Sequence, residues 1–124
     1  MLVKIVTEHG TLVANINDSV KSNFIRTIIK SLPLKGFANR WGDEIYFDIG
    51  LKLDNGDAQS ELEIGTIAYW PPGSAICIFF GRTPISDTDK PKPYSPVVVL
   101  GRIIDREINI LQKVKDGEII CITK

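Results

Sequence analysis

The chain has 124 residues, of which 44% are hydrophobic and 24% are charged, and this size and composition are typical of one globular domain. Fifteen basic residues balance fifteen acidic ones, so the formal net charge at pH 7 is zero. This balance argues against a protein that binds nucleic acid or an anionic membrane, because both need a basic excess or a basic stripe. We therefore expect a single domain over residues 1–124 with neither kind of partner.

The first third of the chain predicts a β-hairpin followed by a helix. Residues 2–7 and 11–16 are apolar strands joined by a turn at 8–10. One of the polar residues at 17–19 then caps a helix, which Pro33 ends. The apolar positions of this helix recur at helical spacing and are Val20, Phe24, Ile25, Ile28, Ile29 and Leu32.

The next segment predicts a loop, a strand and a turn. Residues 34–42 are rich in Gly, Asn and Arg, which favours a loop. Residues 44–49 alternate in polarity, as a strand with one buried face does. On this pattern one face carries Ile45, Phe47 and Ile49, and the other carries Glu44, Tyr46 and Asp48. The Asp-Asn-Gly-Asp run at 54–57 predicts a turn.

The second half of the chain is again rich in short strands. Residues 66–70 and 75–80 predict two apolar strands around a Pro-Pro-Gly corner at 71–73. A proline-rich loop at 83–96 leads to a strand at 97–104 that is apolar on both faces, as interior strands are. The remaining elements are a short helix at 107–114, a turn at 116–117 and a last strand at 118–123. Many short strands with two helices favour a closed β-barrel or a β-rich α+β domain.

Four motifs carry a family resemblance. They are residues 39–47 (NRWGDEIYF), 68–73 (AYWPPG), 77–84 (CIFFGRTP) and 95–97 (SPV). With these motifs, nearly the whole chain resembles a small family of prokaryotic cyclophilin-like proteins of unknown function. The resemblance implies a mainly β fold, a closed cyclophilin-like β-barrel of about eight strands with two helices at its open ends. It implies no particular reaction, because the family has no established one.

The likeness to true prolyl isomerases is more distant. Residues 20–24 (VKSNF) resemble the Asn-Phe start of a cyclophilin helix, which is a structural segment. Cyclophilins also have a catalytic arginine and a downstream Phe-Met-x-Gln-Gly-Gly-Asp block, but this chain lacks the block and continues after Arg40 with Trp-Gly-Asp-Glu. The departure falls on the residues that carry the chemistry, which leaves a degenerate isomerase as an alternative.

The candidate site is an aromatic pocket near the start of the 44–49 strand. We expect it to bind a small molecule or a short peptide, with aromatic and proline walls, a polar contact from Glu44, and Arg40 or Arg82 at the rim. The residues predicted to form it are Arg40, Trp41, Glu44, Tyr46, Pro72, Phe79, Arg82 and Pro84. If the Glu44 face points into the barrel, burial should raise the pKa of this carboxyl. Alternation places Phe79 and Phe80 on opposite faces, so only one of them can line the pocket.

Three other interpretations stay open. Trp41 can plug the barrel while the charges around it are solvated. The protein can be an enzyme that uses Glu44, the candidate catalytic residue, as acid or base. It can also be a protein-interaction module, in which case the loop at 83–96 presents an exposed apolar patch. Oligomeric state and substrate do not follow from the sequence.

The sequence predicts no metal and no cofactor. His9 is the single histidine, and it lies in a predicted turn without neighbouring Cys, Asp and Glu at metal-binding spacing. The acidic residues from Asp54 to Glu63 lack the calcium-loop pattern, and the chain has no glycine-rich phosphate loop.

The expected location is the cytoplasm. Residues 1–10 contain too short an apolar run for a signal peptide, and no stretch has the roughly 18 apolar residues of a spanning helix. Cys77 and Cys121 fall in predicted strands, so we expect buried free thiols. The abundance of isoleucine is compatible with a thermophilic source.

Overall fold

The structure is a computed structural model that describes residues 1–18, 22–53 and 57–124. The predicted helix position Val20, the capping candidate Ser19 and residues 54–56 of the predicted turn lie outside these ranges. Within them, one sheet holds nine strands: β1 (Leu2–Thr7), β2 (Gly10–Ile16), β3 (Leu34–Phe37), β4 (Asn39–Arg40), β5 (Glu44–Asp48), β6 (Thr66–Trp70), β7 (Ala75–Phe79), β8 (Val98–Ile103) and β9 (Ile119–Thr123). The helices are α1 (Asn23–Lys30) and the 3₁₀ helices η1 (Pro71–Gly73) and η2 (Ile108–Lys113).

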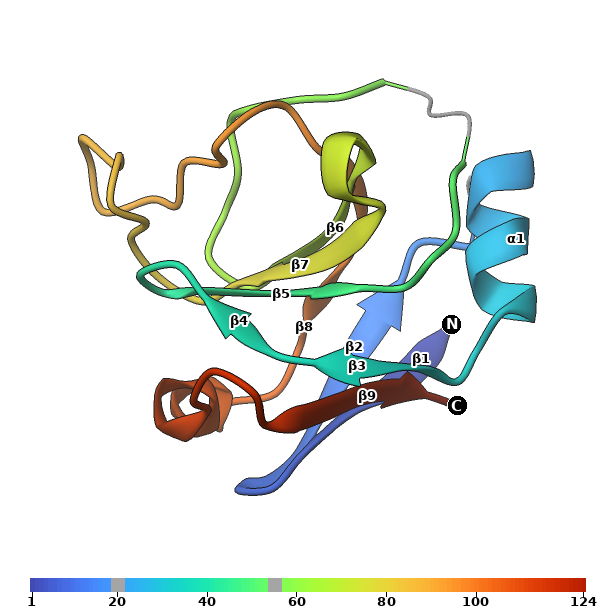
Figure 1. Cartoon of the computed structure of the whole chain (residues 1–124), viewed down its shortest axis with the longest axis horizontal. Coiled ribbons are helices and arrows are strands. Elements are labelled where there is room, and N and C mark those ends of the chain that lie inside the picture. The colour runs from blue at the N-terminus through green and yellow to red at the C-terminus, as the bar shows by residue number, and fades with distance from the viewer. Residues whose placement is uncertain (19–21, 54–56) are drawn as a thin grey trace.

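The sheet curls into a nearly closed barrel (Figure 1). Its strand order is β3-β9-β1-β2-β8-β6-β7-β5-β4, so β3 and β4 stand at the two ends. These two strands follow each other along the chain with only Ala38 between them, which brings the ends of the sheet together. Closure leaves few unpaired strand edges. The predicted mainly β, cyclophilin-like barrel is confirmed, with nine strands in place of about eight.

The predicted loop at 34–42 is wrong, because this segment supplies β3 and β4. Leu34 pairs with Ile122 of β9, and Arg40 pairs with Ile45 of β5. A Cβ atom at Gly36 would lie 2.9 Å from the ring of Phe47, so glycine allows β3 to approach β5 closely. Pairing with β9, which is distant in sequence, decides the conformation of β3, and pairing with β5 decides that of β4; local composition reports neither.

The helix α1 begins later than the sequence predicts. Ser22 caps it, with its Oγ accepting a hydrogen bond from Phe24 N at 3.1 Å. Asp18, one of the predicted capping residues, instead accepts a bond from the N-terminal ammonium at 3.0 Å. The helix ends at Lys30, three residues before the predicted stop at Pro33, with Ser31 as its C-cap. The predicted second helix at 107–114 is the 3₁₀ helix η2.

The barrel interior is filled by aliphatic and aromatic side chains, with Tyr69 of β6 among the largest that are fully buried. Its ring stands edge-on to Phe24 of α1, with the centroids 5.3 Å apart. Its hydroxyl donates a hydrogen bond to Leu51 O at 2.7 Å and accepts one from Leu53 N at 3.3 Å. Tyr69 therefore ties the segment after β5 to the core.

Tyr69→Phe should lower the free energy of unfolding by about 1–2 kcal/mol. The ring still fills the core, but two backbone groups lose their partner, and an unsatisfied buried polar group costs about that much. Urea denaturation measures the change. Tyr94→Phe is the matched control, because Tyr94 is 74% exposed and its hydroxyl borders solvent. An equal loss in both variants would contradict this role for Tyr69.

A second layer covers part of the outside of the barrel. The segments 57–65 and 80–97 contain no helix or strand, in agreement with the predicted proline-rich loop, and arch over β5, β6 and β7 (Figure 1). They join at a bridge in which Gln59 and Val97 exchange backbone hydrogen bonds of 2.8 and 3.0 Å. Leu62 and Val97 are buried against side chains of the sheet. In the part of the chain that the structure describes, no helix is long and apolar enough to cross a membrane.

Candidate ligand pocket on the outer face of the barrel

The candidate site lies between the sheet and this covering layer, outside the barrel. The predicted alternation of β5 is confirmed, because Ile45 and Phe47 enter the main core and Tyr46 packs with the smaller cluster beneath the loops. The sequence left open whether the face of Glu44 and Tyr46 points into the barrel, and the structure places Tyr46 in the cluster on the other side of the sheet. Burial of Glu44 comes from the covering segments and not from barrel closure.

The turn that joins β4 to β5 positions Trp41 and Glu44. These two residues exchange backbone hydrogen bonds, from Trp41 N to Glu44 O at 2.9 Å and from Glu44 N to Trp41 O at 3.2 Å. Gly42 has a φ of +60°, and a Cβ atom there would lie 2.9 Å from Arg82 O. Asp43 N donates to the same carbonyl at 2.8 Å. Glycine thus lets the turn lie directly on the chain that leaves β7, which fixes both side chains relative to β7.

A cavity of about 180 Å³ opens between the turn, the sheet and the covering loop. For comparison, a protein cavity of about 150 Å³ holds benzene. The lining residues are Trp41, Glu44, Tyr46, Trp70, Cys77, Phe79, Pro93, Tyr94 and Val97. The space therefore suits a small molecule or a single side chain.

At the pocket, the ring of Tyr94 stands nearly at right angles to two other aromatic rings. Tyr94 is edge-on to Trp41, with centroids 6.1 Å apart and planes at 75°, and edge-on to Trp70, at 6.2 Å and 89°. Trp70 is held in place by a hydrogen bond from its Nε1 to Ser95 Oγ at 2.7 Å. Tyr94 itself is largely exposed, so the covering loop places it at the mouth of the pocket.

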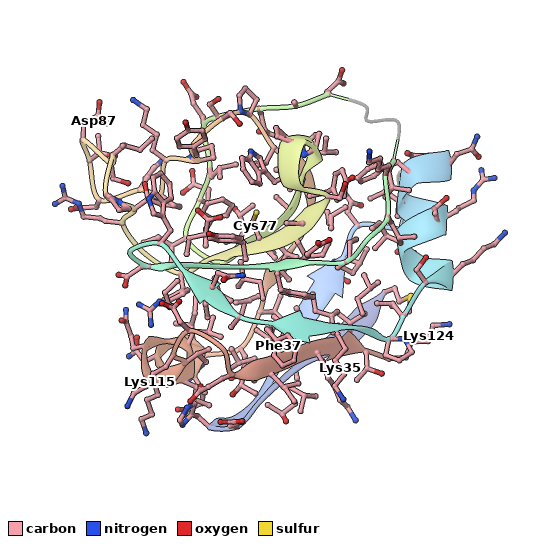
Figure 2. All side chains as sticks on the ribbon, in the orientation of Figure 1. Lys35, Phe37, Cys77, Asp87, Lys115 and Lys124 are labelled. Carbon is pink, nitrogen blue, oxygen red and sulfur yellow. The ribbon has the colours of Figure 1, made fainter. Side chains whose placement is uncertain are left out.

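Glu44 is the acidic group of the pocket, and its side chain is buried, with 6% of the residue exposed. Burial raises the pKa of its carboxyl to about 7, and a hydrogen bond with the Cys77 thiol opposes that rise. The pKa of Cys77 is itself raised, first by burial and then by the nearby Glu44 charge. Cys77 lies on β7, under the covering loops (Figure 2). Near neutral pH this carboxyl is therefore balanced between its acidic and ionised forms.

The cyclophilin-like family profile matches residues 1–123. The chain belongs to the cyclophilin-like family. The solution structure of a hypothetical protein from Archaeoglobus fulgidus is similar to it, with a TM-score of 0.80 and 40% sequence identity over 99% of this chain and 93% of that one. No curated protein matches the chain in sequence.

Four of the eight residues predicted for the site of this cyclophilin-like protein line the cavity: Trp41, Glu44, Tyr46 and Phe79. Phe80 points the other way and joins the main core, as alternation predicts. Trp70 and Cys77 also line the cavity and are not among the eight predicted residues, although alternation along β6 and β7 places them on the Phe79 face. Pro93 and Tyr94 come from irregular chain, where no periodicity signals which side chains point inward.

Arg40 does not line the cavity, because its guanidinium is used elsewhere. It donates to Gly42 O at 2.9 and 3.0 Å and to Val114 O at 2.9 Å, and it forms an ion pair with Asp43 at 3.4 Å. It also stacks over the ring of Phe80, 5.0 Å from the centroid. Arg40 therefore links the β4–β5 turn to the end of η2.

Pro72, Arg82 and Pro84 also lie outside the cavity lining. Pro72 is exposed on η1. Arg82 is exposed and donates to Ser86 O at 3.2 Å, and Pro84 packs against the backbone of Gly42. The prolines and the arginine thus shape the corner and the loop, while aromatic side chains form the walls.

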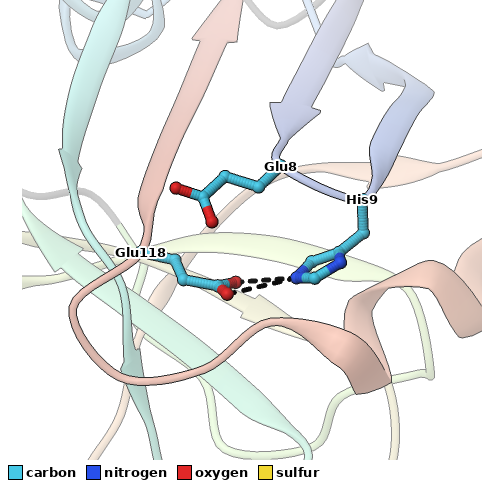
Figure 3. Close-up of side chains that lie close together, drawn as sticks. All are labelled: Glu8, His9 and Glu118. Atoms are coloured by element: carbon cyan, nitrogen blue, oxygen red, sulfur yellow. Dashed lines mark hydrogen bonds and ion pairs between the residues drawn. The ribbon is translucent and has the colours of Figure 1, made fainter.

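His9 is exposed in the β1–β2 turn, as predicted. The expectation that no acidic cluster lies near it is wrong, because the fold brings Glu8 and Glu118 beside it. Its Nε2 lies 2.9 and 3.2 Å from the two carboxylate oxygens of Glu118, and Glu8 lies beside them (Figure 3). The backbone N–H of Lys115 also donates to Glu118 at 3.0 Å, and this bond is the first cause of the lowered pKa of that carboxyl. An exposed ion pair accounts for the cluster, and we assign no metal to it.

Both cysteines are free thiols, as predicted. Cys77 is buried as expected, whereas Cys121 is only half-buried.

Proposed function

We propose that this cyclophilin-like protein binds a small molecule, or one side chain of a short peptide, in the pocket on the outer face of its barrel. The observation that carries the proposal is a cavity with mainly aromatic walls and one buried carboxyl. Small-molecule sites have this composition, with apolar walls and a few polar groups that orient the ligand. The cytoplasmic location inferred from the sequence stays a prediction.

The buried carboxyl of Glu44 supports a role in ligand binding more than a role in packing alone. Removing an ionisable group from water costs free energy, and the pKa of about 7 is the direct sign of that cost at Glu44. A side chain that only filled space here would be more stable if it were apolar. Pockets that bind and react are where such groups gather.

A fragment screen that uses the NMR and fluorescence signals of the two tryptophans tests the proposal. Trp41 and Trp70 both line the pocket, so a bound fragment should shift both indole N–H resonances and quench their fluorescence. Binding also stabilises the native state, by about 2.7 kcal/mol at a hundredfold excess over Kd. Trp41→Ala should abolish the thermal shift produced by a hit, because it removes one wall.

Phe37→Ala is the control, since Phe37 is 67% exposed on β3, away from the cavity. It should leave every hit intact. A broad library that moves neither indole resonance would contradict the proposal.

A second candidate is an enzyme that uses Glu44 as general acid or base. The observation that favours it is the pKa near 7, because a catalytic acid or base works best when its pKa is close to the operating pH. A reaction of this kind should show a pH–rate profile with an inflection near 7 that is lost in Glu44→Gln. The geometry gives no comparable support to prolyl isomerisation, since Arg40 is bound to backbone carbonyls outside the cavity.

A further inference from the structure

We propose that the pocket selects a positively charged ligand, and specifically a small alkylammonium group that sits among the rings of Trp41, Trp70 and Tyr94 beside Glu44. This inference rests on the proposed ligand-binding function and adds the chemical class of the ligand. It is carried by the arrangement of the rings and by the charges that line the cavity.

The rings form an aromatic cage. Tyr94 is nearly perpendicular to both Trp41 and Trp70, so the three planes cannot stack on one flat ligand together. They suit a rounded group that contacts several rings at once. A cation over an aromatic face is attracted by the ring quadrupole, and tryptophan is the strongest partner, so cages of this kind recognise quaternary ammonium ligands.

The charges in the cavity have one sign. Four lining groups can titrate, namely Glu44 and Tyr46 from β5, Cys77 from β7 and Tyr94 from the covering loop. Each of these four side chains is neutral when protonated and negative when deprotonated, so none of them can carry a positive charge. Among the lining residues that the structure describes there is no Lys, Arg or His. A cation therefore meets no repulsion, whereas an anion would face the Glu44 charge without a partner.

A cationic ligand would also supply the positive charge that the ionised Glu44 carboxylate lacks in the cavity. The Cys77 thiol is a weak donor, and it is the side chain whose hydrogen bond acts on this carboxyl. An ionised carboxylate in an apolar cavity is unfavourable until a countercharge arrives. A neutral apolar ligand would fill the cage but would leave the carboxylate further desolvated. A positively charged ligand satisfies the rings and the carboxylate together.

The size of the cavity limits the ligand. About 180 Å³ is a little more than the cavity that accommodates benzene, so a trimethylammonium group with a short tail is an appropriate probe. Choline has this group and a fixed charge at every pH. Its neutral isostere, 3,3-dimethylbutan-1-ol, has the same shape with carbon in place of nitrogen.

The test is a titration of both probes into ¹⁵N-labelled protein, followed by the two indole N–H resonances. We expect choline to shift both resonances with a Kd at least tenfold lower than that of the isostere. Glu44→Gln should weaken choline binding about tenfold and should not weaken binding of the isostere. Glu61→Gln is the matched control, because Glu61 is an exposed carboxylate outside this cavity, and it should change neither probe.

The pH dependence gives a second readout. Choline does not titrate, so any dependence comes from the protein. Ionised Glu44 is the form that binds choline more tightly, and its pKa of about 7 means that it is scarce at pH 5.5 and dominant at pH 8. The uncharged form should bind about tenfold more weakly, as Glu44→Gln does, so the apparent affinity should rise roughly sevenfold across this range in the wild type and stay flat in Glu44→Gln.

The outcomes separate the two proposals. Equal affinity for choline and the isostere would overturn the cation inference while supporting a pocket that binds neutral ligands. Tighter binding of the isostere would do the same. Absence of choline binding at pH 8 would overturn the cation inference too, and the fragment screen would then decide whether the pocket binds anything. Preferential choline binding that depends on Glu44 supports both proposals.

Discussion

Replacing Glu44 by Gln should raise the free energy of unfolding at pH 8.5 by about 3 kcal/mol and change it little at pH 4. The pKa of this carboxyl is about 7 in the folded protein and about 4.5 in the unfolded chain. Between these values the native state binds more protons than the unfolded state, so stability falls as the pH rises from 4.5 to 7. Each unit of difference between the two pKa values corresponds to about 1.4 kcal/mol of stability, and this loss of stability is complete well above pH 7.

Gln keeps the shape and the hydrogen-bonding oxygen but cannot ionise, so Glu44→Gln should lose this pH dependence. Thermal unfolding measured from pH 4 to pH 8.5 checks it. For a domain of this size about 1 kcal/mol moves Tm by about 4 °C, so the variant should melt about 12 °C above the wild type at pH 8.5. Glu61→Gln, at an exposed position, should follow the wild-type curve. A Tm difference between Glu44→Gln and the wild type that is equal at pH 4 and pH 8.5 would contradict the idea that burial of the ionised Glu44 carboxylate destabilises the fold.

Gly101→Ala should lower the free energy of unfolding by about 3 kcal/mol. Gly101 lies on β8, opposite Ile16 of β2, and a Cβ atom there would overlap the backbone carbonyl oxygen of Asn15. A backbone carbonyl cannot move to another rotamer as a flexible side chain can, so β2 and β8 would have to separate. Overpacking of this kind typically costs 1–3 kcal/mol, and the lack of a yielding side chain places Gly101 at the upper end.

Gly50→Ala is the control for Gly101→Ala, because it tests backbone strain without a clash. Gly50 has a φ of +69°, and among the described residues other than its chain neighbours no heavy atom lies within 4 Å of the position its Cβ would take. That variant should lose about 1 kcal/mol from the positive φ alone. Urea denaturation of both variants gives the comparison. A loss at Gly101 no greater than the loss at Gly50 would mean that the two strands accommodate a methyl group, against the close approach seen here.

Several features of the fold followed from local patterns. Alternation in β5 placed Ile45 and Phe47 in the core and Glu44 on the opposite face, because successive side chains of a strand point to opposite sides whatever surrounds it. The same rule separated Phe79 from Phe80. Turn residues placed the β1–β2 hairpin, and Pro33 predicted the end of α1 to within three residues, since both act on the backbone itself.

Other features were not visible in the sequence. The 34–42 segment lacks strand periodicity, and it becomes β3 and β4 only because β9 and β5 offer it hydrogen-bond partners. The contacts of Arg40 with Val114 O, and of His9 with Glu118, join residues 74 and 109 positions apart. No local pattern reports contacts between such distant parts of the chain.

The sequence by itself determined the cyclophilin-like family, the β-rich barrel and half of the predicted pocket residues, because these depend on motifs and on strand alternation. Only the tertiary structure decided on which side of the sheet the pocket lies and which residues close it. Alternation tells which side chains share a face but not what covers that face. Here the irregular loop at 80–97 covers it, and the loop brings Tyr94 to Trp41 and Trp70 above a carboxyl that the same loop removes from water.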